Sequence, residues 1–244
     1  MIERSGSRPY STSIVDLPTA RAAIWPMRRR IDARHRDDTV TRIQHDNASR
    51  RENQMGKIVI SDNVTLDGVI QDPAGDEGFR VGGWVGLIKD SPQVTKLALD
   101  EALGAGALLL GRRSYEWFAA RWPSRNGELA DRINSLPKYV VSSTLEDPDW
   151  SNSTVLKGDV LNEVSKLKQE LDGEIVVWAS FRLVRTLMEH DLVDELRLKL
   201  FPVVLGAGER LFGETSDQKP MRLLDTQILE GGIAYLTYQP VRDA

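Results

Sequence analysis

The chain has 244 residues, 41% of them apolar, with no cysteine and only three histidines. The lack of cysteine excludes disulfides and thiolate chemistry, and three scattered histidines argue against a histidine metal site. No run of about 18 apolar residues occurs, which argues against a membrane-spanning helix. We therefore expect a soluble, cytoplasmic protein that binds neither a metal nor a membrane.

Charge divides the chain into two unlike segments. Residues 1–54 hold 11 arginines, no lysine and 7 acidic residues, a net charge of +4, whereas residues 55–244 carry −8. The first segment also lacks helical or strand periodicity, so we predict a disordered or weakly structured extension over 1–54 and an α/β domain over 55–244. The stretch MRRRIDARHRDD admits nucleic-acid binding as an alternative, but its interspersed acids favour a solvated tail.

From Met55 onward, apolar strand patterns alternate with amphipathic helix patterns. The predicted strands cover residues 57–61, 107–113, 138–145, 153–158, 174–178, 194–201, 222–229 and 233–240. The predicted helices cover residues 91–103, 114–122, 127–136, 160–171 and 181–188. Between them, residues 63–78 are rich in Gly, Asp and Pro, which is typical of a loop.

The early strands are continuous and apolar, whereas the last two form a hairpin pattern around the turn EGG. This order predicts a doubly wound, mainly parallel sheet with an antiparallel C-terminal hairpin. The strand at 194–201 alternates leucines with Arg197 and Lys199. We therefore expect it to have one buried face and one wet face, in an antiparallel or edge position.

Five turns that follow apparent strands carry the residues capable of chemistry. Ligands of open α/β sheets bind outside the carboxyl ends of the strands, so we expect these turns to converge there. No glycine-rich dinucleotide fingerprint or phosphate-loop motif is present. The turns are Asp67-Gly68, Gly111 to Ser114, Ser142 to Thr144, Ala179-Ser180 and Gly206 to Gly208.

The stretch LLLGRRSYEWF admits two interpretations. Gly111 allows the backbone to approach a ligand, Arg112 and Arg113 offer forked donors for phosphate, and Ser114 can cap the next helix and bond an anion. The alternative is a capped helix with two solvated arginines. The same choice applies to Ser142 to Thr144, because such residues are ordinary in turns.

Four stretches of the chain carry a family resemblance. They are VTLDGVIQDPAG, LLLGRRSYEWF, PKYVVSSTL and VVWASFRLVRTLMEHDLVDELRLKLFPVVLGAGERLF. Together they resemble the dihydrofolate reductase-like family, in particular the C-terminal reductase domain of the bifunctional riboflavin-biosynthesis deaminase/reductase. The resemblance covers about Lys57 to Tyr238 and is most specific from Leu192 to Phe212. It implies a dihydrofolate reductase-like fold, NADPH as cofactor, a heterocyclic substrate of pterin or ribosylaminopyrimidine type, and a homodimer.

The resemblance assigns two of the turns to the cofactor's phosphates. The residues that match the family's phosphate turn are Gly111, Arg112, Arg113 and Ser114. The residues that match the turn around the adenosine 2′-phosphate are Ser142, Ser143 and Thr144. Two arginines near a serine pair suit NADPH better than NADH, because the extra phosphate favours charge-assisted donors.

The resemblance also implies roles for the two remaining site segments. Asp67 and Gly68 match the loop beside the nicotinamide, with Asp67 or a bound water as the proton source. Ala179, Ser180 and Phe181 match the pyrophosphate turn, where relatives usually carry Gly-Ser or Gly-Gly. The Ser180 hydroxyl and the helix dipole preserve an anion site, whereas the Ala179 methyl restricts the backbone and is expected to lower affinity.

Two functions are open at this point. The first is an NADPH-dependent reductase that works by hydride transfer, which needs no cysteine or histidine because the cofactor supplies the reactive atom. The second is a catalytically quiet, dimeric nucleotide-binding or interaction protein on the same scaffold, if Ala179 narrows the turn. Reduction of folate itself is disfavoured, because the acids Asp100 and Glu101 are expected at solvated helix positions.

Overall fold

The computed structural model describes residues 55–88 and 91–242. Residues 1–54 lie outside this part, so the domain boundary and the tail's properties stay predictions. The strands are β1 (Lys57–Thr65), β2 (Ala105–Gly111), β3 (Lys138–Val141), β4 (Ser153–Leu156), β5 (Glu174–Trp178), β6 (Glu195–Phe201), β7 (Met221–Ile228) and β8 (Ala234–Pro240). The helices are α2 (Pro92–Gly104), α3 (Arg112–Ala119), α4 (Glu128–Ser135), α5 (Val160–Glu170) and α6 (Phe181–Glu189), with 3₁₀ turns η1 (Trp84–Leu87) and η2 (Glu230–Gly232).

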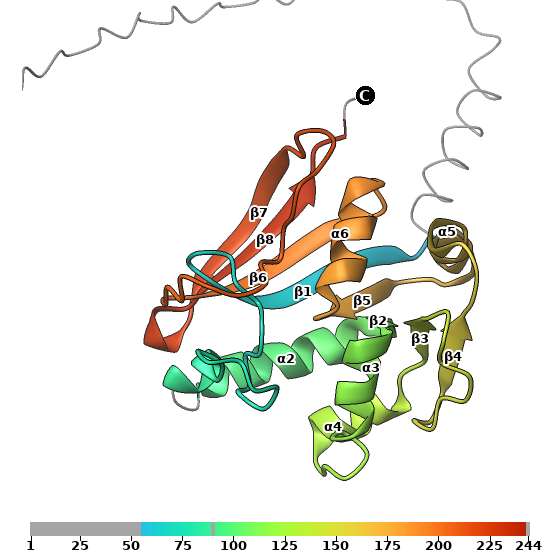
Figure 1. Ribbon diagram of the computed structural model, residues 1–244, viewed down its shortest axis with the longest axis horizontal. Helices are drawn as coiled ribbons and strands as arrows, with labels where there is room; N and C mark the ends of the chain where they lie inside the picture. The colour runs from blue at the N-terminus through green and yellow to red at the C-terminus, as the bar shows by residue number, and fades with distance from the viewer. Residues whose placement is uncertain (1–54, 89–90, 243–244) are drawn as a thin grey trace, which may run out of the picture. The chain divides into compact units, whose positions relative to one another are not determined.

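The strands form one eight-stranded sheet in the order β4-β3-β2-β5-β1-β6-β8-β7 (Figure 1). The first six strands pair in parallel, and β8 and β7 continue the sheet as antiparallel strands. The predicted fold class is therefore confirmed. None of the helices in the described residues is long and apolar enough to cross a membrane.

Strand β1 lies at the centre of the sheet and extends beyond its neighbour β5. The pairing of β1 with β5 ends at Ser61 and Trp178, whereas its pairing with β6 continues to Thr65. The last residues of β1 therefore have a strand partner on one side only, at the carboxyl end of the sheet.

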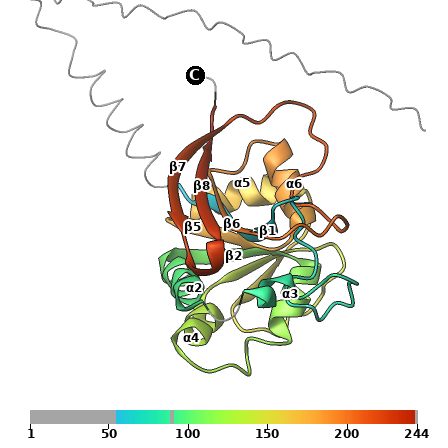
Figure 2. The same cartoon turned by 90° about the vertical axis from the view of Figure 1, so that its left-hand side faces the viewer.

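Each face of the sheet carries its own apolar core. Helices α5 and α6 cover one face and α2, α3 and α4 cover the other (Figure 2). Because side chains alternate along a strand, Ile58 and Ile60 pack toward α5 and α6 while Val59 packs toward the opposite helices. Burial of each such side chain contributes about 1.5–3 kcal/mol.

Helices α2 and α5 each begin after a residue whose side chain caps the first turn. Ser91 accepts a hydrogen bond from the Val94 amide at 3.3 Å, and Pro92 occupies the first helical position. Asp159 accepts a bond from the Asn162 amide at 2.9 Å. These bonds satisfy amides that a helix start leaves without partners.

Helix α3 begins earlier than predicted. It starts at Arg112, directly after β2, and Gly111 is its N-cap. Ser114 therefore lies within the first turn, and its predicted capping role is wrong. The reason is that β2 leads into the helix without an intervening polar turn, so both arginines are helical.

Strand β6 pairs in parallel with β1 and antiparallel with β8, so the predicted antiparallel pairing is confirmed on one side. It is an interior strand, so the alternative edge position and the predicted wet face are wrong. The charged side chains of β6 have partners of opposite charge. Arg197 donates two hydrogen bonds to the Glu174 carboxylate, at 2.9 and 2.6 Å. Lys199, only 6% exposed, pairs with an acid of α2.

That acid is Glu101, which is 5% exposed rather than solvated as expected. Its carboxylate accepts bonds from the Ser61 hydroxyl at 2.8 Å, Lys199 Nζ at 3.1 Å and the Tyr235 hydroxyl at 3.2 Å. Lys199 also donates to the Ser61 hydroxyl at 2.8 Å. Burial and the Glu101 charge raise the pKa of Tyr235. Every charge of this network has a partner, as a buried ion pair requires.

The Lys199→Met variant leaves the Glu101 carboxylate buried without its cation. We expect it to lose about 3 kcal/mol of unfolding free energy, because an uncompensated buried charge is costly. The double variant Lys199→Met/Glu101→Gln removes both charges and is expected to recover most of that loss. Urea unfolding followed by circular dichroism measures both, and equal losses in the two variants would contradict this account.

Candidate active site

Two strand-to-helix turns meet at the carboxyl end of the parallel strands. The amide of Gly111, the last residue of β2, donates a hydrogen bond to Ser180 Oγ at 3.0 Å. The Ser180 hydroxyl in turn donates to the carbonyl oxygen of Trp178, the last residue of β5, at 3.2 Å. One hydroxyl group thus holds together the start of α3 and the start of α6.

The turn after β3 joins the same group. Arg112 donates from its guanidinium to the Thr144 hydroxyl, which links α3 to this turn. Ser142 shapes the turn from within, because its hydroxyl accepts bonds from the amides of Thr144 at 3.2 Å and Leu145 at 3.0 Å. Ser143 and Thr144 are exposed. The structure therefore brings three of the predicted turns together.

Helices α3 and α6 both present their first amides at this meeting point. Within the described residues, no side chain caps either helix. The amides of the two first turns belong to Arg112–Ser114 and Phe181–Leu183. Free amides and the helix dipole make such a helix start favourable for an anion, and here two of them lie next to each other.

The turn between β5 and α6 has an unusual backbone for its sequence. Ala179 has a φ of 52° and Ser180 a φ of 63°, both in the left-handed region that favours glycine. A residue with a side chain loses about 1–2 kcal/mol in this conformation. Strain of this kind is concentrated at functional sites, where the surrounding structure maintains it.

Gly111 differs from these residues because its own conformation does not require glycine. Its φ is −76°, and a methyl group placed on it would lie 3.7 Å from the Ser180 side chain, an ordinary contact. The absent side chain therefore leaves space at the turn rather than relieving strain.

The two predicted phosphate-binding arginines have surface partners. Arg112 donates to Glu116 at 2.7 Å, and its side chain is 48% exposed. Arg113 pairs with Glu77 of the loop after β1, and its side chain is 73% exposed. Exposed ion pairs contribute only about 0–1 kcal/mol, so a phosphate group can compete for both arginines.

The loop from Asp72 to Gly83 contributes contacts that the sequence patterns did not indicate. Asp76 accepts a bond from Trp117 Nε1 at 3.0 Å and two from Arg121 at 3.0 and 2.6 Å. The Trp117 bond, with the Arg121 pairing, lowers the pKa of Asp76. The loop is thereby held against α3. The only sequence signal was its DPAGDEG composition, which marks a loop but not its partner.

Asp67 and Gly68 lie at the end of β1, and no hydrogen bond within the described residues joins them to the three turns. The Asp67 carboxylate accepts bonds from the Thr65 hydroxyl at 2.6 Å and the amides of Gly206 at 2.8 Å and Leu205 at 3.2 Å. Gly68 adopts a φ of 80°. These contacts fasten the loop after β1 to the loop after β6.

The same contacts bear on the predicted role of Asp67 in proton transfer. The Thr65 hydroxyl, followed by the Gly206 and Leu205 amides, lowers the pKa of Asp67 to about 2. Its carboxyl group is therefore ionised at neutral pH and accepts three hydrogen bonds from the protein. The geometry favours a positioning role, and proton donation by Asp67 stays a prediction.

The Asp67→Asn variant tests the positioning role through pH. A carboxyl whose pKa is lower in the folded state stabilises the fold above about pH 4, and this contribution is lost as pH falls toward 2. We expect Asp67→Asn to unfold at a lower temperature than wild type at neutral pH, and the difference to shrink in acid. Thermal unfolding across this pH range measures it, with Asp225→Asn, on the exposed strand β7, as control. A difference that is independent of pH would contradict the role.

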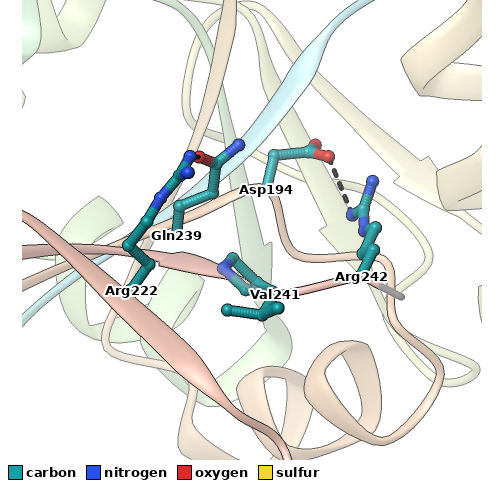
Figure 3. Close-up of a pocket in the computed structure, with 6 residues that line it drawn as sticks. Asp194, Arg222, Gln239, Val241 and Arg242 are labelled. Atoms are coloured by element: carbon teal, nitrogen blue, oxygen red, sulfur yellow. Dashed lines mark hydrogen bonds and ion pairs between the residues drawn. The ribbon is translucent and has the colours of Figure 1, made fainter. Parts of the chain in front are cut away.

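A hollow of about 270 Å³ lies at the opposite, amino end of the parallel strands (Figure 3). Its lining residues are Asp194, Arg222, Gln239, Pro240, Val241 and Arg242. Asp194 accepts bonds from Arg242 at 3.0 Å, Lys168 at 2.5 Å and the Ile58 amide at 2.9 Å. The acid that lines the hollow is thus occupied by protein donors, and none of the predicted site residues lines it.

Comparison with known proteins identifies the family. The sequence model of the RibD C-terminal domain matches residues 56–235, which carry all three of the converging turns. The chain belongs to the RibD C-terminal domain family. The resemblance of the sequence to this branch is confirmed, and membership in this family supports an oxidoreductase of a heterocyclic substrate.

Individual relatives agree with this membership. The chain is 27% identical over 187 residues to the uncharacterized protein YyaP of Bacillus subtilis (strain 168), covering 75% of this chain and 94% of YyaP. A protein of Shewanella sp. PV-4, provisionally named for riboflavin biosynthesis, matches with a TM-score of 0.62 and 19% identity, covering 76% and 99% of the two chains. Dihydrofolate reductase from Enterococcus faecalis, solved with NADP(H), matches with a TM-score of 0.51 and 15% identity, covering 77% and 98%. The two structural matches show the fold of this RibD C-terminal domain family member.

Proposed function

We propose that the protein is an NADPH-dependent reductase of a small heterocycle, pterin-like or ribosylaminopyrimidine-like. The observation that carries this proposal is the hydrogen bond between the Gly111 amide and the Ser180 hydroxyl. It places two uncapped helix starts side by side at the carboxyl end of the sheet. A dinucleotide pyrophosphate carries two negative charges, which two helix starts suit well.

The residues around this bond fit the remaining parts of the cofactor. The exposed turn of Ser143 and Thr144, with Arg112 bonded to it, offers donors for an adenosine 2′-phosphate. The Phe181 ring packs against the Arg185 guanidinium, 4.9 Å from the ring centre, so its backbone amide rather than its ring serves the pyrophosphate. When bound, NADPH supplies the hydride, and the protein orients the reactants and excludes water.

A second function is favoured by one observation. Ala179 holds a left-handed conformation with a side chain attached, at the turn where the cofactor's pyrophosphate is proposed to lie. If its methyl group crowds that position, the protein is a catalytically quiet nucleotide-binding or interaction protein on the same scaffold. The two functions differ in whether NADPH binds and in how substitutions at the turn change its affinity.

Arginine substitutions test the placement of the 2′-phosphate. Fluorescence titration of the full chain is expected to show saturable NADPH binding that is tighter than NADH binding. Arg112→Ala is expected to weaken NADPH about tenfold and to leave NADH almost unchanged, because it removes a charge-assisted donor from the extra phosphate. Arg222→Ala, at the opposite end of the sheet, is the matched control. An absence of binding at millimolar NADPH would refute the reductase proposal.

Substitutions at the meeting turns test the placement of the pyrophosphate. Ala179→Gly is expected to raise the unfolding free energy by about 1 kcal/mol and to tighten NADPH binding, because glycine accepts the left-handed backbone. Gly111→Ala is expected to leave stability unchanged, since its methyl fits the fold, and to weaken NADPH about tenfold by filling the space for the ligand. Unchanged affinity in both variants would place the cofactor elsewhere.

A further inference from the structure

A second carboxyl group, that of Asp62, lies beside the turn of Ala179 and Ser180. The pairing between β1 and β5 ends at Ser61 and Trp178. Asp62 is the next residue along β1, and Ala179 is the next residue after β5. The two residues are therefore level with each other at the point where β5 leaves the sheet and β1 continues.

The surroundings of Asp62 are apolar. Strand alternation places it on the same face as Ile60 and Val64, and its register partner on β6 is Leu198. The residue as a whole is only half-buried, yet Oδ2 has no exposed surface and no hydrogen-bond partner within the described residues. A buried acceptor without a partner costs about 1–3 kcal/mol, so stability does not explain this carboxyl group.

The same surroundings determine its protonation. Burial raises the pKa of Asp62 to about 7, Lys199 of β6 opposes the rise, and Glu101 of α2 adds to it. At neutral pH the group therefore exists in both protonated and ionised forms, which is what a residue that gives and recovers a proton requires. The environments of Asp62 and Asp67 move the two carboxyl pKa values in opposite directions.

We infer that Asp62 contacts the substrate beside the nicotinamide and donates the proton for its reduction. This inference rests on the proposed function. In the step, the carbon of a C=N bond in the heterocycle accepts a hydride from NADPH, and its nitrogen accepts the proton of the Asp62 carboxyl group. The products are the C–H and N–H bonds of a reduced heterocycle, NADP⁺ and an Asp62 carboxylate, which recovers its proton from water.

Carbon-13 NMR of the full chain, labelled at aspartate carboxyl carbons, tests the position of Asp62 without a substrate. The resonance missing from Asp62→Asn is expected to titrate near pH 7. NADPH is expected to raise this midpoint by excluding water, and NADP⁺ to give a lower midpoint than NADPH because its nicotinamide ring carries a positive charge. Asp62→Leu provides the same assignment if the Asn variant does not fold, and Asp67→Asn is the control that leaves this resonance in place.

The outcomes distinguish a failure of the role inferred for Asp62 from a failure of the proposed NADPH binding. If both cofactors bind but give the same Asp62 midpoint, Asp62 is not beside the nicotinamide and the inference is wrong. If neither cofactor binds, the proposed function fails and the inference fails with it. With a dihydropterin as the acceptor, Asp62→Asn is expected to bind NADPH within about twofold of wild type and to oxidise it at least about 100-fold more slowly. Undiminished oxidation by this variant would assign the proton to another group.

Discussion

A single hydrogen bond, from the Gly111 amide to the Ser180 hydroxyl, holds two helix starts together at the carboxyl end of the parallel strands. It joins segments that are 69 residues apart in the chain, and it exists because β2 and β5 are neighbours in the sheet. Two parallel strands that end together bring the helices after them to one place, and each helix contributes a free amide end. Topology thus places two helix starts that favour an anion next to each other, before any charged side chain is considered.

Two aspartates near the end of β1 show how environment separates similar groups. Asp67 accepts three hydrogen bonds and is held as a carboxylate that fastens two loops. Asp62 lies among apolar side chains, and its Oδ2 has no hydrogen-bond partner in the part of the chain that the structure describes. Pairs of carboxyl groups whose pKa values are pushed apart are a common source of distinct acid and structural roles in enzymes. The assignment proposed for Asp62 follows this logic, since burial rather than sequence motif distinguishes it.

The sequence predicted the order of strands and helices and the residues of the three converging turns, because periodicity and turn composition are local properties. Errors arose where a distant partner decides the environment. The sequence pattern predicts exposed side chains for Lys199 and Glu101. Both are buried, because each neutralises the charge of the other although they lie 98 residues apart in the chain. The early start of α3 and the apolar setting of Asp62 likewise depend on packing between elements, which one sequence without structural context does not reveal.

A crystal structure of the protein with NADP⁺ would show where the cofactor binds. We expect the pyrophosphate between the first turns of α3 and α6, within hydrogen-bond distance of amides from both helices, and the 2′-phosphate at Arg112 and Thr144. A cofactor bound instead in the hollow around Asp194 and Arg222, or one that contacts only one of the two helix starts, would contradict this placement.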